Sequence, residues 1–246
     1  MSAGADRGRR ARLEAVGQPA QSARGPGRPP VPQSEIDKAT LRALEARCEP
    51  YGDRARIYHG DANELVHEML AQVPVKAPAF AFLDPEGSEL HWATVEAIAA
   101  HKHGQPRKIE QLILFPTDMG FVRLMADHPE KVDRIFGPGD WRSIADARRA
   151  GEIDPDQARG AYVRRYANGL SDLGYATVLD RQMRTQSGSP LYFLIFATDH
   201  PAGERIMDNV FDKVRLRVIE ELGQGKLFDM AEPRVPRRKR LGDHSG

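Results

Sequence analysis

Apolar and polar residues follow one another along most of the chain in the pattern of an α/β protein. Dense apolar runs at residues 77–83, 109–115 and 191–198 are bounded by proline, glycine or aspartate, which predicts strands buried in a sheet. Residues 91–100 and 156–173 instead place apolar side chains at helical spacing. Because strands that alternate with helices imply right-handed crossovers, the pattern predicts a mainly parallel sheet.

Further elements complete the predicted sheet. A short strand is expected at residues 55–59, followed by a loop and a helix at residues 64–72. Residues 175–183 and 191–198 predict two strands that residues 186–190 join as an antiparallel hairpin. The predicted fold is α/β, a Rossmann-type, mostly parallel sheet with a C-terminal antiparallel hairpin. Class I methyltransferases typically show this order, although a fold does not establish a function.

The two ends of the chain differ from this central part. Residues 1–33 contain no Ile, Phe, Tyr, Trp or Lys and are rich in Arg, Ala, Gly and Pro, so they bury little and are expected to be disordered. Residues 34–222 are expected to form one α/β domain in which the polar stretch 129–160 is a helical insertion. Residues 223–246 are interpreted as a polar, basic tail.

Composition narrows the classes of protein that fit. The formal net charge of +1 gives no overall field towards nucleic acid or membrane, although the basic run at residues 237–240 leaves two readings open, a nucleic-acid contact or a solvated tail. The single cysteine, Cys48, cannot form an internal disulfide or a cysteine-built zinc site and fits a reducing, cytoplasmic setting. No apolar run approaches the roughly 20 residues that span a bilayer, so no membrane association is expected.

Candidate chemistry is expected just after the strands, because ligands of open α/β sheets bind beyond the carboxyl ends of the strands. Gly60, Asp61 and Asn63 follow the strand at residues 55–59. Gly60 allows close approach of the backbone, and Asp61 and Asn63 offer acceptors and a donor suited to an adenine edge. The alternative is that Asp61 or Asn63 caps the helix that starts near Glu64. Both interpretations can hold together.

Two further acidic turns follow the next strands. Asp84 and Glu86 flank Pro85. Asp84 is suited to orient a nucleophilic amine or hydroxyl or to bind the amino group of a cofactor, and Glu86 to act as a general base. The alternative is a tight strand–helix turn with a solvated carboxylate. Asp118 and Arg123 fit either a helix cap with an anion-binding arginine, or a cap with a structural ion pair.

Two other residue groups are given structural interpretations. His91, His101 and His103 do not show a metal-ligand spacing, and the latter two suit the end of a helix. Trp141 is interpreted as a packing anchor. No metal site is expected.

In this order, the motifs resemble the three-Cys-motif partner proteins (TcmP), a bacterial group with a methyltransferase-like fold. The resemblance covers roughly residues 35–230, and the order of the motifs carries it. The matching segments are residues 60–63, 80–87, 112–116 with Arg123, 136–141 and 191–203.

The resemblance implies a cofactor and roles for individual residues. It implies S-adenosylmethionine, with Glu35 or Asp37 holding the ribose hydroxyls, Asp61 and Asn63 on the adenine side, and Asp84 as the aspartate of the catalytic loop. It also implies a partner, a second protein with three clustered cysteines that hold an iron–sulfur cluster.

The sequence departs from the family at its N-terminus. No strand with a glycine-rich cofactor turn is expected before Ser34, residues 30–33 are too rich in proline for a sheet centre, and Leu114 replaces an asparagine. The first βαβ unit is therefore expected to be missing or degenerate, either as a truncated or out-of-frame reading or as a genuine replacement segment.

Three functions follow as hypotheses. The first is a methyltransferase-like protein of unknown acceptor, inactive if the missing turn is essential. The second is a non-catalytic partner or scaffold of an iron–sulfur protein. The third is a protein associated with nucleic acid.

Overall fold

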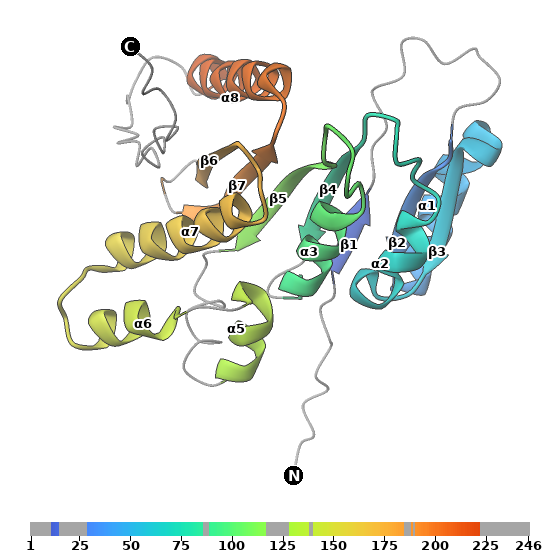
Figure 1. Cartoon of the computed structure of the whole chain (residues 1–246). Coiled ribbons are helices and arrows are strands. Elements are labelled where there is room, and N and C mark those ends of the chain that lie inside the picture. The colour runs from blue at the N-terminus through green and yellow to red at the C-terminus, as the bar shows by residue number, and fades with distance from the viewer. Residues whose placement is uncertain are drawn as a thin grey trace, which may run out of the picture.

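The structure is a computed structural model that describes residues 11–14, 29–85, 89–116, 128–137, 140–184, 188 and 190–221, with side chains described between residues 29 and 212. Its centre is one seven-stranded sheet in the order β3-β2-β1-β4-β5-β7-β6 (Figure 1). The strands are β1 (Ala11–Glu14), β2 (Val31–Glu35), β3 (Ala55–His59), β4 (Phe80–Pro85), β5 (Glu110–Pro116), β6 (Thr177–Arg184) and β7 (Pro190–Thr198).

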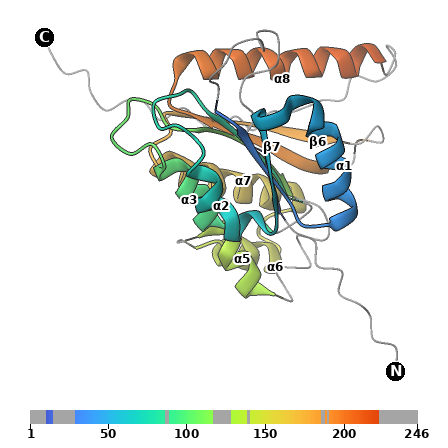
Figure 2. The ribbon, with the colours of Figure 1, turned by 90° about the vertical axis from the view of Figure 1, so that its right-hand side faces the viewer.

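Helices cover both faces of this sheet. They are α1 (Lys38–Cys48), α2 (Ala62–Leu70), α3 (Trp92–Ala100), α5 (Pro129–Phe136), α6 (Arg142–Arg149), α7 (Pro155–Asp172) and α8 (Pro201–Glu221), with a 3-10 helix at Glu49–Arg54. Figure 2 shows α1 and α8 on one face and the other helices on the opposite face. This arrangement confirms a mixed α/β fold. Within the described residues, no helix has the length and apolar character needed to cross a membrane.

The direction of the strands corrects the expected mostly parallel sheet. β2 is parallel to β3, and β4 is parallel to β5. β7 is antiparallel to both β5 and β6, which confirms the C-terminal hairpin. β1, however, is antiparallel to both of its neighbours, so two of the six pairings are parallel.

β1 and β2 also correct the expectation that order begins at Ser34. Residues 11–14 and 31–33 form strands, because the flanking strands supply the ladder partners that these short segments need. Among the described residues, β1 pairs with β2 at Glu14, opposite Gln33, and Pro32 has its register partner on the other side, Arg56 of β3.

The main core lies between the sheet and the helices α2, α3, α5 and α7. Alternate residues of β5 are buried, and Phe115 lies within a cluster of aromatic rings that includes Phe136 and Tyr166. The expected helices of residues 129–160 are present as α5, α6 and the first turns of α7. Trp141 is buried against Phe136, which confirms its interpretation as a packing anchor.

Candidate functional site

The candidate site is the carboxyl edge, which we define as the edge of the sheet where β2, β3, β4 and β5 end. Acidic residues lie at or near three of these ends: Glu35 is the last residue of β2, Asp61 follows β3 and Asp84 lies near the end of β4. The order β3-β2-β1-β4-β5 matches the doubly wound order, in which ligands bind where the strand order reverses. In this chain the strand at that point is β1, and its amino end lies at this edge because Ala11 pairs with Pro85.

Asn63 joins the start of α2 to the loop before α3. Its amide Nδ2 donates to Asp61 Oδ1 at 2.9 Å and to the carbonyl oxygen of Glu89 at 2.8 Å. Its Oδ1 accepts from the backbone N–H of His91 at 2.9 Å and from the Thr94 hydroxyl at 2.7 Å. An amide side chain has two donor hydrogens and two acceptor lone pairs, so these four bonds use its whole capacity. Asn63 therefore braces the site rather than presenting groups to a ligand.

Asp61 is the N-cap of α2, as the cap interpretation predicts. Its Oδ1 accepts from the backbone N–H of Asn63 at 2.9 Å, in addition to the amide of the same residue. The second carboxylate oxygen, Oδ2, accepts no hydrogen bond from the described part of the chain. Asp61 is half-buried, so its carboxylate has one oxygen committed to the helix and one that is open to a ligand.

Gly60 has a steric reason to be glycine. Its φ is +155°, and a Cβ at this position would lie 2.9 Å from Leu65 Cδ1. Its backbone N–H donates to the carbonyl oxygen of Glu35 at 3.1 Å, which holds the ends of β2 and β3 together.

Glu35 and Asp37 are the two residues that the resemblance offers for holding the ribose hydroxyls, and the structure gives them different surroundings. Glu35 is 5% exposed, and its Oε1 accepts from the backbone N–H groups of Ile36 and Asp37, both at 3.0 Å. Asp37 is exposed and caps α1 by accepting from the backbone N–H groups of Ala39 and Thr40. Glu35 is therefore held at the carboxyl edge, whereas Asp37 serves the helix.

Asp84 lies half-buried near the end of β4, at the register position of Arg12 in β1. Four other predicted features lie outside the described residues: Glu86, Asp118, Arg123 and the basic run at residues 237–240. The carboxyl edge thus brings together Glu35, Asp61 and Asp84 from three strands.

His91, which the sequence analysis considered only as a metal ligand and set aside, also lies at this edge. It begins α3 as its N-cap residue, but its imidazole makes no cap hydrogen bond. Burial lowers the pKa of His91, the neighbouring Arg134 lowers it further, and Asp61 opposes these effects. His91 is 28 residues from Asn63 in sequence, so no local pattern connects it to the loop after β3.

A small apolar pocket lies between the ends of β4 and β5. It is bounded on its far side by α5 and α7. Leu114, which stands where the resemblance implies asparagine, is one of its walls and helps to keep it apolar. Its lining residues are Pro85, Leu90, Ile113, Leu114, Phe115, Pro116, Ile135 and Tyr166.

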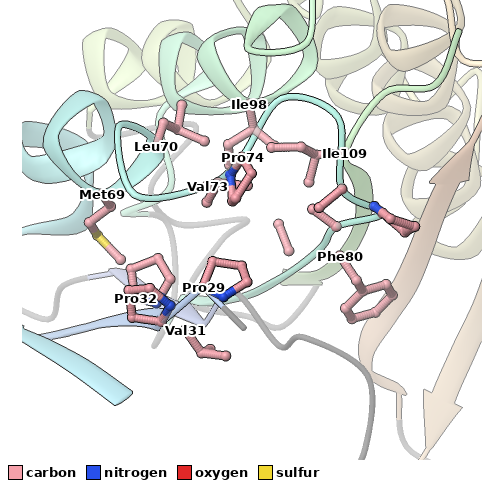
Figure 3. Close-up of a pocket in the computed structure, with 15 residues that line it drawn as sticks. Pro29, Val31, Pro32, Met69, Leu70, Val73, Pro74, Phe80, Ile98 and Ile109 are labelled. Atoms are coloured by element: carbon pink, nitrogen blue, oxygen red, sulfur yellow. The ribbon is translucent and has the colours of Figure 1, made fainter. Parts of the chain in front are cut away.

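A larger pocket opens at the opposite edge of the sheet, between the amino ends of β2 and β4 (Figure 3). Its walls include Val31, Met69, Val73, Phe80 and Ile98. None of its lining side chains is titratable. The chemistry therefore gathers at the carboxyl edge rather than at the larger pocket.

Within the described ranges, no group of three or more His, Cys, Asp or Glu side chains is placed to hold a metal ion. Comparison with known protein families, with curated proteins and with solved structures found no match for this chain.

Proposed function

We propose that this chain is a methyltransferase-like protein of the three-Cys-motif partner type, and that its carboxyl edge binds S-adenosylmethionine or a closely related adenosine ligand. One observation carries the proposal: acidic residues lie at the carboxyl ends of three strands on one edge of the sheet, Glu35 at the end of β2, Asp61 after β3 and Asp84 near the end of β4, with β1 between β2 and β4.

The three carboxylates suit different parts of such a ligand. Glu35, at the end of β2, is suited to accept hydrogen bonds from the ribose hydroxyls. Asp61 has one oxygen open to the exocyclic amine of adenine. Asp84, near the end of β4, is suited to orient the amine or hydroxyl of a methyl acceptor. The bound cofactor would supply the methyl group.

A second candidate, a non-catalytic partner or scaffold, is favoured by the direction of β1. Its last residue, Glu14, pairs with Phe82, so the strand runs away from the carboxyl edge. In the doubly wound fold the turn after the first strand holds the phosphate or equivalent part of the ligand at that edge. A reversed β1 cannot present its following turn in this way, so tight binding of the methionine part is not expected.

Isothermal titration of S-adenosylmethionine and S-adenosylhomocysteine into the full chain tests the proposal. We expect micromolar binding that weakens about tenfold or more in Asp61→Asn, because asparagine preserves the helix cap but removes the charge. Asp172→Asn, an exposed aspartate at the end of α7, is the matched control and should bind as the unchanged protein does. A folded chain that binds neither compound favours the scaffold candidate.

A further inference from the structure

The larger pocket, at the amino ends of β2 and β4, has apolar walls. Its described lining residues are proline, alanine, valine, leucine, isoleucine, methionine and phenylalanine, and none of them can carry a charge. An ionised group inside these walls would lose its hydration without meeting a side chain of opposite charge, which is strongly unfavourable. The lining therefore favours an uncharged, mainly apolar occupant.

Prolines give this pocket stiff walls. Five of the lining residues are prolines: Pro29 and Pro30 precede β2, Pro32 lies in β2, and Pro74 and Pro78 lie between α2 and β4. Figure 3 shows Pro29 and Pro32 across the pocket from Pro74. Each proline has a fixed φ and no backbone N–H, so these walls resist collapse and add no backbone donor to the pocket. A stiff pocket favours a rigid occupant, because little conformational freedom is lost on binding.

Residues 73–79, which we call the strap, separate the pocket from solvent. The strap lies between α2 and β4. Val73 and Ala77 are half-buried and line the pocket, whereas Val75 is 43% exposed and Lys76 is also exposed. One side of the strap therefore faces the pocket, and the other side faces water.

Two side chains at the end of α3 hold the strap by its backbone. His101 Nε2 donates to the carbonyl oxygen of Val73 at 2.8 Å, and Lys102 Nζ donates to the carbonyl oxygen of Ala77. Lys102 is only 4% exposed, and a buried ammonium group is unfavourable unless it is hydrogen-bonded. Its bond to Ala77 therefore stabilises both the lysine and one position of the strap. The outer wall of the pocket is thus fixed from a neighbouring helix.

We propose that the larger pocket binds a compact, uncharged aromatic molecule, and that His101 and Lys102 are positioning residues that fix its outer wall. An aromatic ring is rigid and buries a large apolar area in a small volume, which suits stiff apolar walls. The pocket lies at the opposite edge of the sheet from Asp61 and Asp84, so this site is separate from the proposed cofactor site.

Titration of the full chain with naphthalene and with 2-naphthoate, followed through methyl resonances by NMR, tests the inference. Naphthalene is expected to shift the methyl resonances of Met69, Val73 and Ile98, which line the pocket, and to leave those of Val163 in α7 unchanged. 2-Naphthoate has the same rings but carries a carboxylate, so its affinity should be lower by about tenfold or more.

Two pairs of variants test the walls of the pocket. Ala79→Leu places a larger side chain in the pocket and should lower the affinity for naphthalene by about tenfold or more, whereas Ala46→Leu, exposed in α1, should not change it. Lys102→Met removes the bond to the strap and should speed the dissociation of naphthalene several-fold, measured from NMR line shapes. Lys76→Met removes an exposed lysine of the strap and should leave this rate unchanged.

Each result decides one part of the inference. Unchanged methyl resonances at the solubility limit of naphthalene would overturn the binding site, and equal affinities for the two compounds would overturn the uncharged occupant. If Ala79→Leu does not fold, Ala77→Leu fills the pocket from the strap and takes its place. An unchanged dissociation rate in a folded Lys102→Met or His101→Phe protein would overturn the positioning role. None of these results depends on the binding of S-adenosylhomocysteine, so the proposed function is tested separately.

Discussion

Removal of the Asn63 side chain should destabilise the protein through the loss of a defined set of hydrogen bonds. Asn63→Ala removes four bonds with lengths of 2.7 to 2.9 Å, of which one lies within the cap of α2 and three join α2 to α3 and the loop before it. Each such bond contributes about 0.5–1.5 kcal/mol net, and water can reach some of the freed partners, so we expect a loss of about 2–3 kcal/mol. Urea unfolding followed by circular dichroism at neutral pH measures this loss directly.

Two variants act as controls for this prediction. Thr94→Val removes one of the four bonds at a buried position and should cost about 1 kcal/mol, whereas the exposed change Glu68→Ala should stay within about 0.5 kcal/mol of the unchanged protein. An Asn63→Ala protein that unfolds at the same urea concentration as Glu68→Ala would refute the bracing role. That result would favour the amide of Asn63 as a ligand-binding group instead.

Two further predictions concern the packing and the electrostatics around the α5–α7 region. Gly169→Ala should destabilise the fold by about 1–3 kcal/mol in thermal unfolding, because the new Cβ would lie 2.6 Å from Trp92 Cη2. Gly160→Ala in the same helix is the control. Its Cβ meets only the flexible end of an arginine, so this change should be neutral or stabilising. Hydrogen bonds from Arg142 and Trp141 lower the pKa of Asp133 below its ordinary 3.8, so its stabilising contribution is present above that pH and is lost as the pH falls through the lowered value. The unfolding free energies of the unchanged protein and Asp133→Asn should therefore converge as the pH is lowered below 3.8, and a difference that is constant with pH would contradict this assignment.

The sequence predicted those strands and helices that a local pattern of residues indicates. The apolar runs that became β4, β5 and β7 are bounded by proline, glycine or aspartate, and the cap of α2 follows from the position of Asp61. The sequence did not predict β1 and β2, because four- and five-residue strands with little periodicity depend on the strands beside them.

The same distinction applies to the carboxyl edge. Asp61 and Asp84 were found because each follows or ends a predicted strand, whereas Glu35 was found only through the family resemblance, since no strand was expected before it. The roles of all three towards a cofactor stay predictions. His91 was passed over because a histidine before a helix carries no signal of its own. Its significance comes from Asn63, a contact across 28 residues that only the folded chain brings together.

Hydrogen–deuterium exchange in the presence and absence of S-adenosylhomocysteine tests the central claim most directly, because it reports where on the chain a ligand binds. We expect added protection in two segments of the carboxyl edge, residues 59–65 and 89–95, with no change at residues 73–81 beside the larger apolar pocket. Protection confined to residues 73–81, or no change at a saturating concentration of the compound, would contradict the assignment of the carboxyl edge as the binding site.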